Sequence, residues 1–298
     1  MNALKAALVR TLLRMLSLLP LVFARGLGRV FGRLAWLFNG RSRRVTQRNI
    51  ELAFPDQSAQ FQTQLARRSL SSTAELMAET GRIWLRPWSQ VSRLILQVEG
   101  ADFISDALAN GRGVVVLVPH LGNWEMVGLH LATLGPTVSL YEPPKLAGLG
   151  PIIEASRQRS GARLVPASRA GVAGLLRSVK AGAISGILPD QVPSAVGSGE
   201  NAPFMGIPCF TATLASKVIQ RTGAVAVFGF AQRVPGGFVL RYSAAQPEVY
   251  AEDVSLSLTA INRGVEACLR QCPEQYQWEY KRFRVRPKTA PGVYDDLS

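Results

Sequence analysis

The sequence has few of the residues that most often serve as metal ligands or catalytic nucleophiles. Its 298 residues include two histidines and three cysteines. Cys209, Cys268 and Cys272 form no disulfide framework, which favours a reducing compartment. Cys268 and Cys272 are four residues apart on an expected helix, but no histidine lies near them to complete a metal site. Ordinary burial explains them better, so we expect neither a metal nor a cofactor.

Several motifs that would identify a nucleotide-binding protein or a serine hydrolase are absent. The sequence contains no phosphate-binding loop of the Walker type and no dinucleotide fingerprint. It has no Gly-x-Ser-x-Gly turn, since Gly197-Ser198-Gly199 has a different spacing. It also has no recognisable nucleic-acid-binding module. If the protein is an enzyme, its nucleophile should therefore come from a substrate.

Negative charge is missing from the first fifty residues. No acidic residue precedes Glu51, whereas ten lysines and arginines do. Over the whole chain, 34 basic residues outnumber 20 acidic ones, for a net charge of +14. Such an excess implies an anionic partner, which could be nucleic acid, a phospholipid surface, or an acidic protein or substrate.

The basic N-terminal segment is also apolar, but its uncharged runs are short. The longest, residues 15–24, has ten residues, fewer than the roughly 20 that span a bilayer. A cleaved signal peptide is disfavoured because arginines follow. A marginal spanning helix and an amphipathic helix lying in the interface both remain open, beside a helix that merely faces a core. We favour membrane association, and we expect a membrane-associated segment over residues 1–45 and a catalytic domain over residues 46–298.

The rest of the chain has the pattern of an α/β protein. After a helical, polar-faced segment over residues 56–85, strand-like and helix-like segments alternate from about residue 94. This predicts a mixed, largely parallel central sheet flanked by helices, with the N-terminal membrane-associated helix added to it. Residues 189–208, rich in Gly, Pro and Ser, are expected to form a long loop, which would be functional or mobile. Strands are expected at residues 114–118, 138–141, 163–166, 184–188, 224–230 and 238–243, and helices at residues 124–134, 152–159, 171–180, 211–221 and 254–270.

The clearest candidate site follows the expected strand 114–118. His120 comes just after its carboxyl end, where open α/β sheets place their chemistry. If His120 lies in a turn and Glu125 in the first turn of the next helix, the carboxylate can reach Nδ1 and support a general base. Asn123 is a good N-cap for that helix, and it or the free N–H groups there could bind an oxyanion. The alternative is a buried histidine with only a structural hydrogen bond.

The sequence resembles a known family in several blocks that follow in order along nearly the whole chain. The His-x-x-x-x-Glu spacing of His120 and Glu125 is similar to that of glycerolipid-type acyltransferases, and the wider pattern resembles the late acyltransferases of lipid A biosynthesis. One departure is Tyr280, where the family more often has histidine, so we expect no catalytic role there. The matching blocks are residues 49–55, 119–125, 169–171 with 188–191, 203–208 with Thr211 and Thr213, and 273–278 with 281–283 and 286–287.

The resemblance implies transfer of an acyl chain from acyl carrier protein to the hydroxyl of a 3-hydroxyacyl chain on a Kdo-bearing lipid A precursor. His120 would take the proton of the hydroxyl, and Glu125 would orient His120. Asn123 or nearby backbone N–H groups would serve the oxyanion. Arg169 is a candidate for contact with phosphate or the thioester oxygen, although a solvated arginine at a helix start would explain it equally well. The protein would lie at the bacterial inner membrane, with its catalytic domain on the cytoplasmic side and no nucleic acid as partner.

Two further groups of residues come from the matching blocks. Asp190 and Gln191 are candidates for binding the substrate or the oxyanion, because they follow another expected strand and should lie on the same edge of the sheet as His120. The alternative is that they only form the turn after Pro189. Phe204, Met205 and Ile207 could line an acyl-chain groove, although core burial would explain them equally well.

Two other functions remain open at this point. An acyl-CoA-dependent phospholipid or glycolipid acyltransferase would need the same base. A non-catalytic basic protein that binds membranes or nucleic acid would use the N-terminal arginines, with Arg41, Arg43 and Arg44 as the critical ones. The basic tail 282–286 is expected to be a second membrane anchor or docking face, or simply a solvated basic surface.

Overall fold

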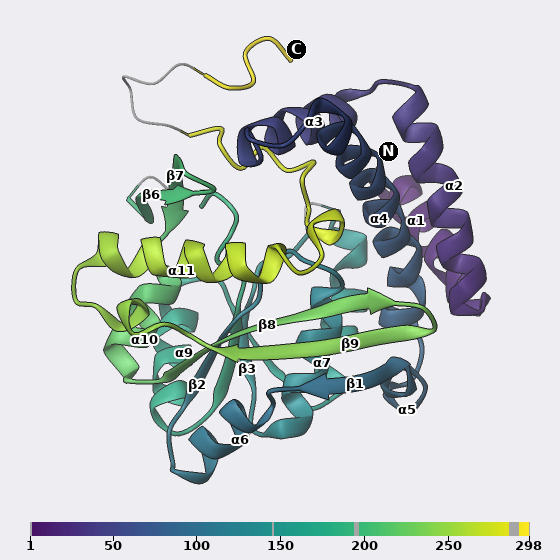
Figure 1. Cartoon of the computed structure of the whole chain (residues 1–298). Coiled ribbons are helices and arrows are strands. Elements are labelled where there is room, and N and C mark those ends of the chain that lie inside the picture. Colours follow the sequence, from purple (N-terminus) through teal and green to yellow (C-terminus); the bar gives the residue numbers. More distant parts are fainter. Residues whose placement is uncertain (1, 145, 194–196, 286–291, 298) are drawn as a thin grey trace.

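The computed structural model describes residues 2–144, 146–193, 197–285 and 292–297. A group of N-terminal helices lies against one end of an α/β body (Figure 1). The order agrees with the sequence pattern, except that the basic N-terminal segment forms several helices where a single one was expected. The N-terminal helices are α1 (Asn2–Leu18), α2 (Leu21–Leu37), α3 (Arg41–Ala53) and α4 (Ala59–Leu85).

The central sheet has five strands in the order β1-β9-β8-β2-β5. Three of its four neighbouring pairs are parallel, and the pair β8–β9 is antiparallel because a tight hairpin joins the two strands. The predicted mixed, largely parallel sheet flanked by helices is therefore confirmed. The strands are β1 (Ile95–Glu99), β2 (Val114–Leu117), β5 (Ile184–Ile187), β8 (Val225–Val234) and β9 (Gly237–Ala244).

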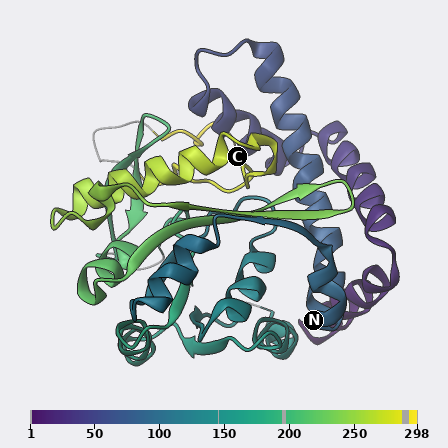
Figure 2. The same ribbon diagram turned by 60° about the horizontal axis from the view of Figure 1, so that its bottom comes forward.

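Helices cover both faces of this sheet (Figure 2). Strand β2 is fully buried, and its side chains alternate between two cores. Val115 and Leu117 join the larger core, which α9, α10 and α11 complete, while Val114 and Val116 join the core formed with α6 and α7. A strand that is apolar on both faces is what a parallel sheet between two helical layers requires. The helices of the body are α5 (Trp88–Val91), α6 (Asp102–Ala109), α7 (Trp124–Leu134), α8 (Gly150–Gln158), α9 (Arg169–Lys180), α10 (Leu214–Thr222) and α11 (Val254–Leu269), with 3-10 turns at Ser92–Leu94, Ala147–Leu149, Pro247–Tyr250 and Pro273–Gln275.

Two small sheets flank the central one. Strands β3 (Val138–Tyr141) and β4 (Arg163–Pro166) form a parallel pair. The expectation of a continuous loop over residues 189–208 is wrong, because β6 (Gly199–Phe204) and β7 (Ile207–Ala212) form an antiparallel hairpin there. Its Gly and Pro content was typical of a loop, but Ala202, Phe204 and Cys209 are buried, so packing outweighs local propensity. The same hairpin delays the following helix, which was expected from Thr211, to Leu214.

The N-terminal helices pack tightly on α4. Gly28 and Gly32 on α2 let its backbone approach that of α4, and a Cβ at either position would collide with backbone atoms of Glu75 or Ser71. Helix α3 runs through residue 45, where a domain boundary was expected. None of the helices in the described residues combines the length and the apolar character that a membrane crossing requires.

Candidate active site

The turn that follows β2 is fixed from two sides. Gly122 has a positive φ of 61°, and a Cβ there would collide with the carbonyl oxygen of Ala231 at the carboxyl-terminal part of β8. Its N–H donates to the carbonyl of Gln275 (3.0 Å), while the N–H of Asn123 donates to Ala231 (2.9 Å). The carbonyl of His120 accepts from the N–H of Gln277 (3.1 Å). The C-terminal segment therefore holds the histidine turn against the sheet.

Asp190 holds the imidazole of His120. The carboxylate lies beyond β5, the parallel neighbour of β2, so both residues share one edge of the sheet as expected. It accepts from the backbone N–H of His120 (2.9 Å), and its second oxygen lies 2.8 Å from Nδ1. Burial alone would raise the pKa of the Asp190 carboxyl, but the charge and hydrogen bonds of His120 outweigh it, and this pKa falls below its ordinary value. The arrangement puts the Nδ1 proton toward Asp190 and leaves Nε2 as the basic nitrogen.

Glu125 does not occupy the position expected for it. It begins the first turn of α7 as predicted, but its carboxylate binds Arg157 on α8 through two hydrogen bonds, at 3.1 and 2.5 Å. Asp190, which was expected to bind the substrate or the oxyanion, instead stands where the sequence placed Glu125, against Nδ1 of His120. The predicted backbone positions of His120 and Glu125 are correct. The carboxylate that reaches Nδ1 of His120 nevertheless belongs to Asp190, 70 positions further along the chain, because the parallel strands β2 and β5 end at the same edge of the sheet.

Asn123 occupies the N-cap position of α7, but its side chain does not cap the helix. The residue is buried, and Nδ2 donates to Oε2 of Glu79 on α4 (3.0 Å). This contact turns the amide toward the N-terminal helices, which argues against the expected role of its side chain at an oxyanion. The N–H groups of Asn123 and Met126 already donate to carbonyl oxygens, so the backbone candidates for that role are those of Trp124 and Glu125 at the start of α7.

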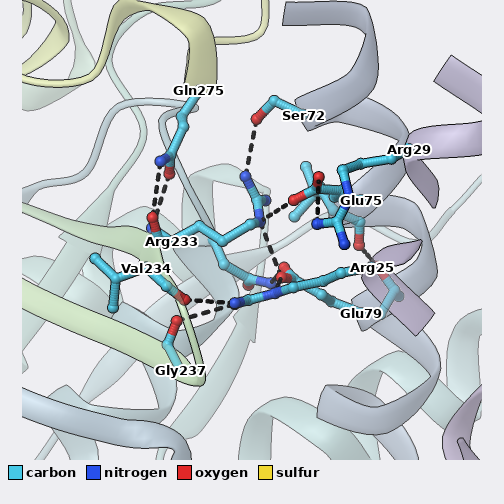
Figure 3. A network of polar contacts seen from close by, with 12 residues as sticks. Arg25, Arg29, Ser72, Glu75, Glu79, Arg233, Val234, Gly237 and Gln275 are labelled. Atoms are coloured by element: carbon cyan, nitrogen blue, oxygen red, sulfur yellow. Dashed lines mark hydrogen bonds and ion pairs between the residues drawn. The ribbon is translucent and has the colours of Figure 1, made fainter. Parts of the chain in front are cut away.

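Glu79 is the centre of a buried ionic network that links the N-terminal helices to the sheet (Figure 3). One of its oxygens accepts from Nε of Arg25 on α2 (2.5 Å) and from Nε of Arg233 on β8 (2.9 Å). Arg25 also donates to the carbonyl oxygens of Val234 and Gly237 at the β8–β9 turn. Glu79 is fully buried. A buried charge needs opposite charges beside it, and the two guanidinium groups around Glu79 supply them.

Among the described residues, neither of two further predicted residues forms a hydrogen bond or ion pair with His120. Arg169 begins α9 after β4 and is exposed. Gln191 follows Asp190, and its Nε2 donates to Oε1 of Gln277 (3.1 Å). The backbone N–H of Gln277 donates to the carbonyl of His120, so Gln191 supports the histidine turn indirectly, through Gln277.

The three residues predicted to line an acyl-chain groove lie in other surroundings. Phe204 is fully buried, with its ring between those of Tyr276 and Phe283. Met205 is in the β6–β7 turn with φ 51°, and its N–H donates to Glu266. Ile207 packs on the edge of the same core. Core burial, the alternative considered for these residues, is what the structure shows for Phe204.

An apolar groove lies instead beside the first turn of α7. This α7 groove has a volume of about 100 Å³, and Trp124, Glu125 and Arg157 are among the residues around it. The ring of Trp124 meets that of His120 edge to face at 4.9 Å, so the groove adjoins the histidine. Its apolar lining comes from α7, β3, β4 and β5, and includes Gly128, Leu129, Leu131, Leu140, Leu164 and Leu188.

Sequence reasoning missed several polar residues of this region. Arg157 lies in α8, outside every block that drew attention. Glu279 lies between two matching parts of the C-terminal block but was passed over. Burial raises its pKa, although hydrogen bonds, including one from Thr73, and the charge of His120 act against this. Tyr280, which was given no catalytic role, binds the backbone N–H of Val192 through its hydroxyl.

The basic tail was expected to be a second anchor or docking face. Arg282 is buried, and it donates to the carbonyl of Phe210 (2.7 Å) and to the hydroxyl of Thr211 (2.9 Å). Arg282 therefore belongs to the core and offers no docking face, whereas Arg284 and Val285 of the same tail are exposed. Residues 286–287, the end of the C-terminal block, lie outside the described residues.

The fold and the site together define the class of protein, an α/β fold with a carboxylate-held histidine beyond β2. Comparison with known families makes this more particular. Residues 2–285 match the family described as bacterial lipid A biosynthesis acyltransferase, and the chain belongs to this family.

Individual relatives cover nearly the whole chain. It is 26% identical over 278 residues to the lipid A biosynthesis lauroyltransferase of Escherichia coli K12, covering 92% of this chain and 89% of the relative. It is 26% identical over 270 residues to the lipid A biosynthesis palmitoleoyltransferase of the same organism, covering 90% and 87%. A lipid A biosynthesis acyltransferase of Haemophilus influenzae is 24% identical over 298 residues, covering 95% and 91%. The resemblance inferred from the motifs is confirmed.

Proposed function

We propose that this protein transfers a fatty acyl chain from acyl carrier protein to the hydroxyl of a 3-hydroxyacyl chain on a Kdo-bearing lipid A precursor. The observation that carries the proposal is the pairing of His120 with buried Asp190 at the carboxyl ends of the neighbouring strands β2 and β5. A histidine held at Nδ1 by a carboxylate can accept a proton at Nε2, which is what the attack of a hydroxyl on a thioester requires.

His120 acts as general base and then as general acid. Its Nε2 takes the proton from the acceptor hydroxyl as the hydroxyl oxygen attacks the thioester carbonyl carbon. The tetrahedral intermediate collapses with cleavage of the C–S bond, and the imidazolium returns the proton to the departing sulfur. The products are the new ester and the free thiol of the carrier. Asp190 positions the ring and stabilises the imidazolium in both steps.

Arg157 is the best-placed cation for the oxyanion of the intermediate. Glu125 holds its guanidinium through two hydrogen bonds beside the start of α7, where backbone N–H groups also point. A guanidinium fixed in this way forms charge-assisted hydrogen bonds with little reorganisation. In this mechanism Glu125 positions Arg157, whereas Asp190 positions His120.

The α7 groove receives the part of the transferred acyl chain next to the thioester, since its volume of about 100 Å³ is smaller than that of a cavity for a whole ligand. Arg157 and Trp124 line the groove, the Trp124 ring contacts that of His120, and leucines and Gly128 form much of its wall. Apolar walls with a few polar groups at one end suit a chain whose only polar atoms are at the thioester. A Cβ at Gly128 would meet no atom within 4 Å, so this glycine leaves room in the groove.

Helices α1 and α2 attach the protein to the membrane by lying in the interface. Each presents one exposed apolar stripe: Leu4, Leu8, Leu12 and Met15 on α1, and Phe23, Leu27, Val30, Phe31 and Leu34 on α2. Exposed lysine and arginine residues border these stripes. Apolar residues in the acyl layer with cations at the headgroups are the arrangement of an interfacial helix. The anionic inner membrane, on its cytoplasmic side, fits this surface and the net charge of +14.

The reaction is tested with the full-length protein, a lipid A precursor and matched acyl donors. We expect transfer from the acyl carrier protein thioester, and a His120→Ala variant should lose most of it while remaining folded. Acyl-CoA of the same chain length should be the poorer donor because it lacks the acidic carrier surface. Near-normal turnover by the His120 variant would contradict the mechanism, and a preference for acyl-CoA would contradict the proposed donor.

Membrane attachment is tested by flotation with vesicles that contain phosphatidylglycerol. Phe23→Glu/Phe31→Glu should reduce binding strongly, because both side chains are exposed on the apolar stripe of α2. Leu256→Glu, at an exposed position of α11, is the matched control and should bind normally. Equal binding of all variants would show that α2 does not enter the membrane.

A further inference from the structure

A large cavity lies between the N-terminal helices and the tip of the β8–β9 hairpin. This arginine cavity has a volume of about 950 Å³ and is bordered by α2, α4, the hairpin turn and the segment around Gln275. It is distinct from the α7 groove, with which it shares no lining residue. Its size is at the upper end of ligand-binding cavities.

The cavity is strongly positive. Six arginines line it against two glutamates, Glu75 and Glu274. Three of the arginines, Arg33, Arg67 and Arg68, are exposed and form no ion pair or hydrogen bond through their side chains within the part of the chain that the structure describes. Because no protein carboxylate neutralises these three, their charge is available to an anion from outside. The six are Arg25, Arg29, Arg33, Arg67, Arg68 and Arg233.

The back wall of the cavity is rigid. Arg25 and Arg233 are held by Glu79, and Arg233 also donates to the hydroxyl of Ser72 (2.8 Å), as Figure 3 shows. The second terminal nitrogen of Arg233 has no hydrogen-bond partner among the described residues. Guanidinium groups that are fixed before a ligand arrives lose little entropy when they bind it.

The cavity adjoins the apolar stripe of α2. Arg25, Arg29 and Arg33 are spaced four residues apart, which brings them to one face of this helix, toward the cavity. Phe23 and Phe31 are exposed on the same helix outside the cavity. A ligand in the cavity would therefore have its charged part among arginines and its apolar part beside the membrane-facing stripe. A glycolipid has this distribution, whereas the folded surface of an acidic protein would not enter a concave site readily.

The cavity is also tied to the catalytic turn. Glu79 binds Arg233 on the cavity side and Asn123, three residues after His120, on the other. Gln275 lines the cavity, and its carbonyl accepts the N–H of Gly122. An acceptor held in the cavity would thus lie one layer of residues from the turn that carries the base.

We propose that the arginine cavity binds the anionic sugar headgroup of the acceptor lipid through its phosphate and carboxylate groups. This assignment rests on the proposed function, since it takes the acceptor to be an anionic glycolipid. Arg33, Arg67 and Arg68 supply the contacts that only the ligand satisfies, and Arg25 and Arg233 shape the back wall. Binding there directs the acyl chains of the acceptor toward the membrane stripe and the histidine.

The decisive experiment measures binding of a soluble headgroup without acyl chains. The probe is a glucosamine disaccharide with phosphates at both ends, titrated calorimetrically into the full-length protein. Arg67→Gln/Arg68→Gln should weaken its binding at least about tenfold, because two charge-assisted contacts are lost. The control, Arg93→Gln/Arg263→Gln, removes the same charge from exposed positions outside the cavity and should bind normally. Equal binding by all three proteins, or none by the unchanged protein, would overturn the assignment.

Two further measurements distinguish binding of the sugar headgroup from binding of free phosphate or of the carrier protein. Inorganic phosphate should compete only weakly with the disaccharide, and binding of phosphate as tight as that of the disaccharide would make this a free-phosphate site. In the transfer assay the cavity variant should raise KM for the acceptor and leave KM for the acyl carrier protein thioester unchanged. The reverse pattern would show that the cavity receives the carrier protein. If the unchanged protein binds the disaccharide but transfers no acyl chain, the proposed reaction fails while the binding site stands.

Discussion

Replacing Asp190 by asparagine separates the role of this residue from that of Glu125. Asp190 accepts two hydrogen bonds from His120, at 2.9 Å from the backbone N–H and 2.8 Å from Nδ1. Asparagine has one acceptor oxygen. If it serves the backbone N–H, the amide N–H₂ faces Nδ1 and drives the imidazole proton to Nε2, where the base must be free. In a serine-protease triad the corresponding change lowers kcat by about 10⁴, which is about 5.4 kcal/mol of transition-state stabilisation.

We therefore expect Asp190→Asn to lower kcat by about 10³ to 10⁴, with the KM values of both substrates little changed. The measurement is steady-state transfer from the carrier thioester, followed over a range of pH. Asp106→Asn, on the exposed face of α6, is the matched control and should be normal. A folded Asp190→Asn protein with almost unchanged kcat, beside a Glu125→Gln variant that is inactive, would refute the assignment and restore Glu125 as the partner of His120.

Three further outcomes follow from other parts of the structure. Gly128→Leu should narrow the α7 groove and shift the preference among carrier-bound acyl chains toward shorter ones by about tenfold or more. Mass spectrometry of the products measures this preference, and Gly128→Ala should give a smaller shift. Burial lowers the pKa of His130, so below about pH 6.5 the unfolded chain binds a proton that the folded chain does not. The free energy of unfolding should therefore decline as pH falls below about 6.5, and His130→Asn should make this decline smaller in denaturant titrations at several pH values. Glu79→Gln leaves Arg25 and Arg233 without a buried counter-charge and should cost about 3–5 kcal/mol in free energy of unfolding, measured by denaturant titration, whereas a change below about 1 kcal/mol, typical of a surface pair, would contradict its burial.

The local part of the site could be predicted because its signals are local. A run of β-branched residues predicts a buried strand, and the residues that follow it predict a turn and a helix, so His120, Asn123 and Glu125 were placed correctly on the backbone. The edge of the sheet that carries Asp190 was also predictable, because parallel strands end together.

The pairing of side chains could not be predicted in the same way. Which carboxylate meets Nδ1 depends on how β5 and α8 approach the turn, and the sequence alone does not contain those distances. Arg157 drew no attention because an arginine on a helix is usually solvated. The β6–β7 hairpin was missed because its Gly and Pro residues favour a loop, while burial of Phe204 and Cys209 favours a strand. Local preference and packing disagree there, and packing decides.

The network around Glu79 has a consequence for how the protein is made. Arg25 donates to carbonyl oxygens at Val234 and Gly237, which are 209 and 212 residues further along the chain. The N-terminal helices are synthesised first, but their buried charges have no counterparts on the sheet until β8 and β9 have been translated. During that interval the apolar stripes of α1 and α2 are already available to the membrane. With the proposed membrane attachment through α1 and α2, the nascent chain would be able to reach the bilayer before its catalytic turn is held in place.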